Sequence, residues 1–205
     1  MAVRLEAGFI VDMTSHETRK KWNHRHSQAD GIGEPANVLV ENLHLLPQSG
    51  SILDLACGRG GNALYLAEKT RLSIDAWDIS DVAVDRVESE AKVRGLSVNT
   101  QVRDISLNPP KPNSFNAIVV THFLDRALAP ALIDALCLGG LLFYQTFTQT
   151  AVSRGGPSNP KMCLGEGELL KLFQQLRLRV YREEGALGDV KRGWRNLAML
   201  VAEKV

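Results

Sequence analysis

Short apolar runs alternate with amphipathic stretches along most of this chain. The runs that predict buried strands are residues 52–55, 72–77, 96–102, 117–121 and 141–147. The stretches that predict helices between them are residues 61–70, 80–94 and 126–138. Strands that alternate with helices are joined by right-handed crossovers into a parallel sheet covered on both faces. The pattern therefore predicts a doubly wound α/β fold.

The last third of the chain departs from this pattern. A polar loop at 148–161 precedes a predicted short helix at 165–175, and two predicted strands follow at 178–184 and 196–205. Consecutive strands with no helix between them favour an antiparallel hairpin at the sheet edge. We therefore expect a seven-stranded, mostly parallel sheet with an antiparallel last strand.

The length of 205 residues indicates a single domain spanning residues 1–205. Residues 1–48, before the first predicted strand, are expected to form a helical cap over a cleft. Residues 49–205 are expected to form the ligand-binding core. No internal repeat or low-complexity tract interrupts the chain.

The net charge and the cysteines limit the classes of partner and the cellular compartment that we expect for this protein. A net charge of +1 argues against a dedicated nucleic-acid-binding protein, whose basic surface usually shows in the totals. Cys57, Cys137 and Cys163 lie far apart and in no metal-ligand spacing, which favours a reducing compartment and no structural zinc site. The N-terminus lacks a signal-peptide pattern, and no apolar run approaches the ~20 residues that span a bilayer. We expect a cytoplasmic protein.

Residues 54–61 carry the strongest functional signal. An apolar strand ends on Asp54, a glycine-rich turn follows with Gly58 and Gly60, and a helical pattern then begins. Glycines let the backbone approach a ligand, and the helix N-terminus supplies unpaired N–H groups. The turn also matches G-x-G-x-x-G with Ala63 as an allowed third residue, so a nicotinamide cofactor stays open.

Three acids follow consecutive predicted strands: Asp54, Asp78 and Asp104. Ligands bind at the carboxyl ends of strands in open parallel sheets. Asp78 follows the turn by about 20 residues, the separation at which a carboxylate meets a ribose held on such a turn. Each acid alone could instead be a helix cap or a solvated loop residue.

Residues 54–60, Asp-Leu-Ala-Cys-Gly-Arg-Gly, resemble the D-x-G-x-G-x-G motif of class I S-adenosylmethionine-dependent methyltransferases, with Ala56 in place of the first glycine. The resemblance extends through residues 103–105 and 115–123 and the glycine pair 139–140. Trp77-Asp78, residues 167–169 and the closing Ala-Met-Leu-Val-Ala-Glu-Lys are similar to the tellurite-resistance and thiopurine group of small-molecule methyltransferases.

This resemblance implies a Rossmann-like fold that binds S-adenosylmethionine and releases S-adenosylhomocysteine. Ile79 and Ile105 would then enclose the adenine, and backbone groups near Ala56 and Thr121 would hold the methionine end. Arg25, in a Trp-x-x-Arg segment, would help to close the site. The cofactor-binding residues that the resemblance implies are Asp54, Ala56, Gly58, Gly60, Asp78, Ile79, Asp104, Ile105, Thr121 and Arg25.

The expected reaction is in-line methyl transfer to a small molecule, which needs no base when the acceptor is a thiol or an oxyanion. His122 is the one candidate base, and its alternative role is to line the pocket. Arg154 and Lys161 could bind an anionic substrate, or belong to a solvated loop. Tyr144 could contact the substrate, or belong to the core.

Other functions remain open at this stage. One is a nicotinamide-dependent oxidoreductase on the same topology, although no Tyr-x-x-x-Lys hydride-transfer apparatus follows the turn. Another is a methyltransferase or binding module that acts on RNA or protein. Residues 121–124 read Thr-His-Phe-Leu rather than the Asn/Asp-Pro-Pro-Tyr/Phe of adenine-N-methylating relatives, which disfavours nucleobase methylation. Neither the acceptor nor the oligomeric state follows from the sequence.

Overall fold

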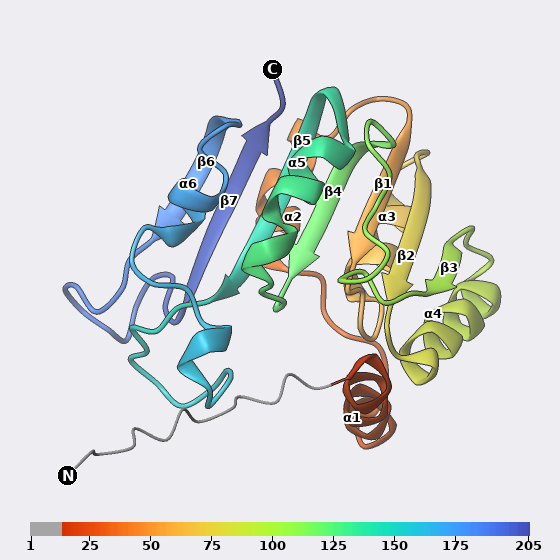
Figure 1. The fold of residues 1–205 in the computed structure, drawn as a ribbon, viewed down its shortest axis with the longest axis horizontal. Helices are drawn as coiled ribbons and strands as arrows, with labels where there is room; N and C mark the ends of the chain where they lie inside the picture. Colours follow the sequence, from red (N-terminus) through yellow and green to blue (C-terminus); the bar gives the residue numbers. More distant parts are fainter. Residues whose placement is uncertain (1–13) are drawn as a thin grey trace, which may run out of the picture.

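The computed structural model describes residues 14–205 and has three layers around a seven-stranded sheet (Figure 1). The sheet order is β3-β2-β1-β4-β5-β7-β6. The strands are β1 Ser51–Leu55, β2 Ser73–Asp78, β3 Asn99–Val102, β4 Phe115–Thr121, β5 Leu136–Phe147, β6 Arg177–Glu183 and β7 Leu197–Glu203. Strands β1 to β5 are parallel, and β7 is antiparallel to both β5 and β6. The predicted mostly parallel sheet with an antiparallel last strand is confirmed.

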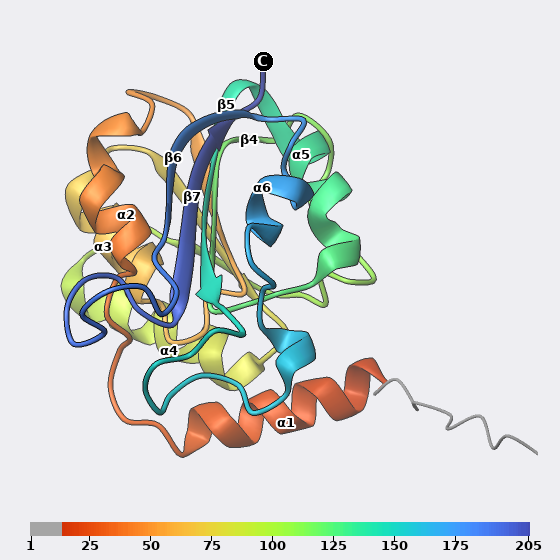
Figure 2. The same ribbon diagram turned by 90° about the vertical axis from the view of Figure 1, so that its left-hand side faces the viewer.

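Helices cover both faces of this sheet (Figure 2). The helices α2, α3 and α4 lie on one face, and α5 and α6 lie on the other. Their bounds, with those of α1 and the three 3₁₀ helices, are α1 Ser15–Ser27, α2 Asn37–Asn42, η1 Leu43–Leu45, α3 Gly61–Lys69, α4 Asp81–Arg94, η2 Arg126–Leu128, α5 Ala129–Ala135, η3 Pro160–Met162 and α6 Glu168–Leu172. None of the helices in residues 14–205 is long and apolar enough to cross a membrane.

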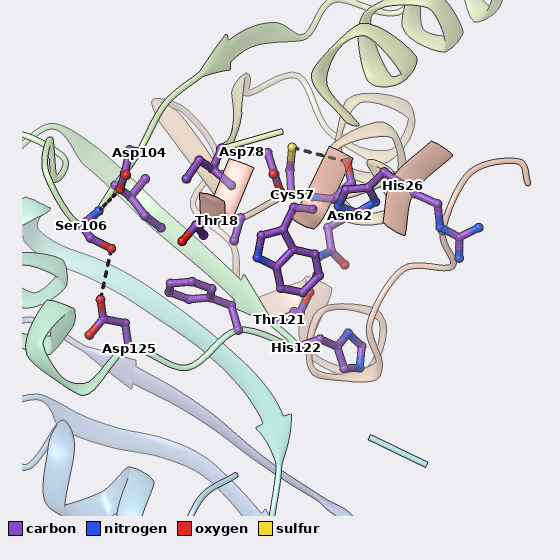
Figure 3. A pocket seen from close by; sticks show the side chains of 18 of the residues that line it. Thr18, His26, Cys57, Asn62, Asp78, Asp104, Ser106, Thr121, His122 and Asp125 are labelled. Carbon is purple, nitrogen blue, oxygen red and sulfur yellow. Dashed lines mark hydrogen bonds between the residues drawn. The ribbon is translucent and has the colours of Figure 1, made fainter. Parts of the chain in front are cut away.

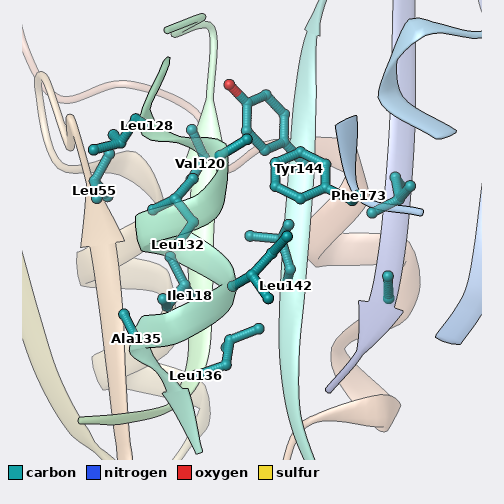
Figure 4. Packing of buried hydrophobic residues seen from close by; sticks show 14 of the residues in the cluster. Leu55, Ile118, Val120, Leu128, Leu132, Ala135, Leu136, Leu142, Tyr144 and Phe173 are labelled. Atoms are coloured by element: carbon teal, nitrogen blue, oxygen red, sulfur yellow. The ribbon is translucent and has the colours of Figure 1, made fainter. Parts of the chain in front are cut away.

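Alternating strand residues supply two cores. Ile118 and Leu142 pack under α5, beside Leu132 (Figure 4). Their neighbours Val119 and Phe143 point to the opposite face and pack with α2 and α3. All of these strand residues are fully buried. This two-sided burial explains why the sequence of each central strand is a continuous apolar run.

Several predicted boundaries are wrong, including those of the helix expected at 165–175, which spans only Glu168–Leu172. The helix expected to reach residue 138 ends at Ala135, and β5 begins at once with Leu136 paired to Phe115. The pairing then shifts register, so the glycine pair 139–140, which precedes the strand expected at 141–147, lies at a bulge inside β5. A side chain on Gly140 would come within 2.8 Å of the Cys137 carbonyl oxygen, which explains the glycine. The third strand begins only at Asn99, after the chain leaves α4 through the left-handed Gly95.

Helix α1 lies beyond the carboxyl ends of the central strands (Figures 1 and 2). It buries none of its residues and is attached through polar contacts. The Ser80 hydroxyl donates to the Asn23 side-chain oxygen (2.7 Å), and Arg86 donates to the Ala29 carbonyl (2.6 Å). Residues 1–13 of the expected N-terminal cap lie outside the described residues. By contrast, α2 packs into the core through Val38 and Leu39.

The buried carboxylate of Asp54 ties the end of β1 to the start of α3. It accepts hydrogen bonds from the Ala63 backbone N–H (3.1 Å) and the Asn62 amide (3.3 Å). Complete burial disfavours the charged form more strongly than these bonds stabilise it, and the pKa of Asp54 rises to about 7. The carboxyl group therefore changes charge near neutral pH.

This raised pKa predicts that stability falls as pH increases between about 4 and 7. The folded protein holds the Asp54 proton over a pH range in which the unfolded chain has lost it. The unfolding free energy therefore decreases as pH rises through this range. The total loss of unfolding free energy is roughly 4 kcal/mol and does not increase further above this pH range. Asp54→Asn should flatten the profile, measured by urea unfolding at a series of pH values. Parallel profiles for the two proteins would contradict the assignment.

Gly61 lies where the segment before α2 crosses the start of α3. A Cβ on Gly61 would come within 2.4 Å of the Gly33 carbonyl oxygen and 2.6 Å of the Glu34 carbonyl oxygen. Gly61→Ala should therefore lower the unfolding free energy by about 1–3 kcal/mol, although alanine favours helix. Gly165→Ala is the matched control, because its nearest neighbour would lie 3.6 Å away. Equal denaturation midpoints for the two variants would show that residues 33–34 and the start of α3 can separate enough to accommodate a methyl group.

Candidate cofactor and acceptor site

A cavity of about 1120 Å³ opens at the carboxyl ends of β1, β2 and β4, under α1. Most of the residues proposed from the sequence line it. The lining residues are Thr14, Ser15, Thr18, Trp22, His26, Gly33, Glu34, Ala56, Cys57, Gly58, Arg59, Gly61, Asn62, Asp78, Ile79, Asp104, Ile105, Ser106, Leu107, Thr121, His122, Phe123, Asp125 and Ala127 (several are drawn in Figure 3).

The turn between β1 and α3 brings the backbone to the cavity wall. Ala56, Gly58 and Gly60 all have left-handed backbone conformations, with φ of 55°, 50° and 78°. Ala56 and Gly58 line the cavity, whereas Gly60 lies behind it, where a Cβ would come within 2.5 Å of Val87. Two positions of the motif thus face the cavity, and the third permits close packing against α4.

Asp78 connects the turn to the end of β2. One carboxylate oxygen accepts the Gly58 N–H and the other accepts the Ser80 N–H, each at 2.8 Å. Burial raises the pKa of Asp78, and the two backbone hydrogen bonds and the charge of His26 oppose that shift. Burial likewise lowers the pKa of His26, while the charge of Asp78 raises it. The carboxylate is fixed in orientation and faces the cavity.

Asp54 and Thr121 occupy different depths of the same network. Asp54 is fully buried and does not line the cavity. Thr121 lines it, and its hydroxyl accepts a hydrogen bond from the Asn62 amide at 2.9 Å. The sequence interpretation missed Asn62, which lines the cavity and joins the two. Its position in the first turn after the glycines was the available signal.

The residues expected around an adenine also lie together. Ile79 and Ile105 line the cavity, with Asp104 beside Ile105. The Ser106 N–H donates to Asp104 (3.0 Å), and the Ser106 hydroxyl donates to Asp125 (3.3 Å; Figure 3). This end of the cavity therefore combines two apolar side chains with ordered hydrogen-bond acceptors.

His122 forms the wall where β4 ends. It is not glycine, yet its φ is 54°, and its N–H donates to the Gln145 carbonyl at 2.9 Å. Its ring lies 5.2 Å from the ring of Phe147. His122 is exposed and lines the cavity, and partial desolvation by the surrounding protein lowers the pKa of its imidazole. The neutral imidazole is therefore the main form at neutral pH.

Four sequence candidates lie away from this cavity. Arg25 is exposed and lies 5.2 Å over the Trp22 ring, so that Trp22, not Arg25, faces the site. Tyr144 is buried in the core, and its hydroxyl donates to the Phe123 carbonyl (2.9 Å). Arg154 and Lys161 are exposed and line neither this cavity nor a smaller one of about 170 Å³ within their own loop.

One face of α1 was not recognised from the sequence. Thr14, just before the helix, and Thr18, Trp22 and His26 within it are spaced by four residues, and all line the cavity. Residues four apart share one face of a helix. The stripe contains one large apolar residue only, so hydrophobic periodicity does not single it out.

Within residues 14–205 no three metal-binding side chains are grouped to hold an ion.

Comparison with known proteins places this site in context. Residues 52–137, from β1 to the start of β5, match the family model described as a methyltransferase domain. That segment contains the glycine turn, Asp78, Asp104 and His122. The match thus covers the carboxyl-end residues from which the cavity is built.

Solved structures share the fold at low sequence identity. TehB from Haemophilus influenzae is 18% identical, with a TM-score of 0.66 over 92% of this chain and 68% of that chain. Geranyl diphosphate C-methyltransferase from Streptomyces coelicolor A3(2), solved with S-adenosylhomocysteine, is 15% identical, with a TM-score of 0.69 over 93% and 97%. The [4+2]-cyclase SpnF is 18% identical, with a TM-score of 0.69 over 97% and 99%.

The domain match and the sheet topology agree with the resemblance found in the sequence. Residues 52–137 match the methyltransferase domain model, and the chain has the Rossmann-like fold that solved S-adenosylmethionine-dependent methyltransferases share.

Proposed function

We propose that this protein transfers the methyl group of S-adenosylmethionine to a small-molecule acceptor and releases S-adenosylhomocysteine. The observation that carries the proposal is the Asp78 carboxylate, fixed by the Gly58 and Ser80 N–H groups at the wall of the large cavity. The domain match over residues 52–137 supports the same reaction class.

Asp78 suits a ribose. Its two oxygens offer about four lone-pair positions, and two of these accept backbone N–H groups. The remaining positions can accept hydrogen bonds from the two ribose hydroxyls. A carboxylate also repels a 2′-phosphate, because both groups are negatively charged.

The other parts of the cofactor have matching surroundings. Ile79 and Ile105 would enclose the adenine, with Asp104 available to an amino group. Ala56, Gly58 and Thr121 would hold the methionine end, where the left-handed turn exposes backbone groups. The predicted roles of Gly60 and Asp54 are indirect, since neither lines the cavity.

The charges lining the cavity suit a cationic cofactor better than a dinucleotide. Glu34, Asp78, Asp104 and Asp125 line it, whereas Arg59 is the only Lys or Arg among the described lining residues. A dinucleotide carries a pyrophosphate, which helix N-termini bind through free N–H groups. Here the Gly58 N–H already donates to Asp78. These features disfavour the nicotinamide alternative. The acidic lining also disfavours an RNA acceptor, because RNA is a polyanion.

The cofactor supplies an activated methyl group when bound, so the chain's own task is positioning. The turn and Asp78 orient the ligand, and the Thr14–His26 face of α1 covers the cavity and limits the entry of water. We further propose a reducing, cytoplasmic setting, supported by three cysteines that are all free thiols.

Asp78→Asn should weaken S-adenosylhomocysteine binding by about 10–100-fold. The amide replaces an acceptor oxygen with a donor and leaves one of the Gly58 and Ser80 N–H groups unpaired. Isothermal titration calorimetry measures this change. Asp85→Asn, on the exposed side of α4, is the control and should bind as the parent protein does. Undiminished binding by Asp78→Asn would refute the ribose assignment.

Cofactor affinity should also decrease on acidification. Only the ionised Asp78 accepts hydrogen bonds with both oxygens, and burial raises its pKa above the usual aspartate value. The dissociation constant of S-adenosylhomocysteine should therefore begin to rise at a higher pH than for an exposed aspartate. Calorimetry across the acidic range in which the protein stays folded tests this. A constant affinity until the pH reaches ordinary aspartate values would contradict it.

A further inference from the structure

Helix α1 carries a basic surface that its contacts with the rest of the chain leave open. Lys20 and Lys21 lie on the side of the helix away from the cavity, and Arg19 and Arg25 flank the stripe that lines it. Lys20, Lys21 and Arg25 are exposed, and Arg19 is half-buried. Within residues 14–205 none of these four cations forms an ion pair with a carboxylate. We call these four residues the basic face of α1.

The neighbouring helix α4 presents the opposite charge (Figures 1 and 2). The Ser80 hydroxyl, at the start of α4, joins the two helices by its hydrogen bond to Asn23. Asp81, Asp85 and Glu88 are spaced by four and three residues, so they share one side of α4. Asp85 and Glu88 are exposed, and no ion pair among the described residues includes any of the three acids. These three residues form the acidic face of α4.

Like charges repel one another within each of these faces. Lys21 and Arg25 are four residues apart on α1, and Asp81 and Asp85 are four apart on α4, a spacing at which like charges destabilise a helix. Helix α1 has only 13 residues and buries none of them, and isolated helices of this length are marginal in water. An oppositely charged surface docked on the basic face would offset the repulsion and stabilise α1.

A second copy of this chain matches both faces at once. Two-fold rotation would place α1 of each copy on α4 of the other, because a contact of this symmetry uses the same surface twice. A nucleic acid would be repelled by the α4 carboxylates, and the net charge of the chain is only +1. A helix that lies in a membrane surface needs an apolar side, whereas the outward positions of α1 include Lys20, Lys21, His24 and Ser27. Charge complementarity therefore favours the second copy.

We propose that two copies of this chain associate through a two-fold contact in which the basic face of α1 in each copy docks on the acidic face of α4 in the other. This contact goes beyond the proposed function and does not depend on it. Exposed ion pairs contribute little each and are screened by salt, so the dissociation constant of the dimer should rise at least about tenfold between roughly 50 and 500 mM sodium chloride. The opposite side of α1 covers the cavity, so the partner copy would also hold this helix over the cavity.

Charge reversal on either helix tests the contact. The α1 variant combines Lys20→Glu with Lys21→Glu, and the α4 variant combines Asp85→Lys with Glu88→Lys, all at exposed positions. Sedimentation velocity at low salt should show a concentration-dependent dimer for the parent protein and a monomer for each variant alone. An equimolar mixture of the two variants should form a dimer again. In that mixture the reversed α1 of one variant meets the reversed α4 of the other, and the second contact keeps its native charges.

The matched control combines Lys111→Glu with Lys191→Glu. Both side chains are exposed in loops outside α1 and α4, and this variant changes the net charge by the same amount as the α1 variant does. It should dimerise as the parent protein does. Far-UV circular dichroism compares the fold of every variant with that of the parent protein. The milder combination of Lys20→Gln with Lys21→Gln removes the two charges without reversing them, and it should weaken the dimer less than the α1 variant does.

A parent protein that stays monomeric at low salt up to about 0.3 mM would overturn the proposal. A dimer that either reversal leaves intact would also overturn it, as would variants that stay monomeric when they are mixed. If the parent protein is monomeric, and poly(U) or vesicles containing phosphatidylserine bind to it but not to the α1 variant, the basic face serves a polyanion or a membrane instead. None of these outcomes affects the proposed function, which S-adenosylhomocysteine binding tests separately.

Discussion

The buried amide of Asn62 connects four parts of the chain that would otherwise be independent. Its oxygen accepts the Ala36 N–H (2.9 Å), and its NH₂ group donates to Thr121 (2.9 Å) and Asp54 (3.3 Å). A polar group buried without a partner costs about 1–3 kcal/mol, so each of these bonds constrains the others. The end of β1, the end of β4, the start of α3 and the entry to α2 are thereby fixed together. The cavity wall is an extension of the core.

The roof of the cavity is built differently from its wall. Helix α1 buries no residue and is attached through hydrogen bonds such as those of Asn23 and Arg86. Segments with few buried apolar contacts open at low free-energy cost. A rigid wall with a weakly attached roof suits an enzyme that must admit a cofactor and an acceptor and then exclude water. His26 adds a link, since its ring and the Asp78 carboxylate influence each other's charge.

The sequence predicted the features that have a local pattern. The central strands are buried on both faces and therefore appear as apolar runs, and the turn at Gly58 and the acid Asp78 have a fixed spacing. Contacts between distant segments have no such pattern. Tyr144 was predicted either to contact the substrate or to belong to the core, and the structure buries it with its hydroxyl donating to the Phe123 backbone. The bulge in β5 reads locally as a helix end and a turn, because pairing with β4 decides it.

The same distinction separates the two halves of the site. One half of the cavity is formed by backbone groups at Ala56 and Gly58 and by the buried acid Asp78. A cyclase shares the fold, so topology alone leaves the reaction open. The other half includes His122, whose position follows from a left-handed backbone and from its contacts with Phe147 and Gln145. Both contacts come from β5, so the pairing of β5 with β4 fixes this half of the cavity wall, whereas the sequence around the glycine turn fixes the other.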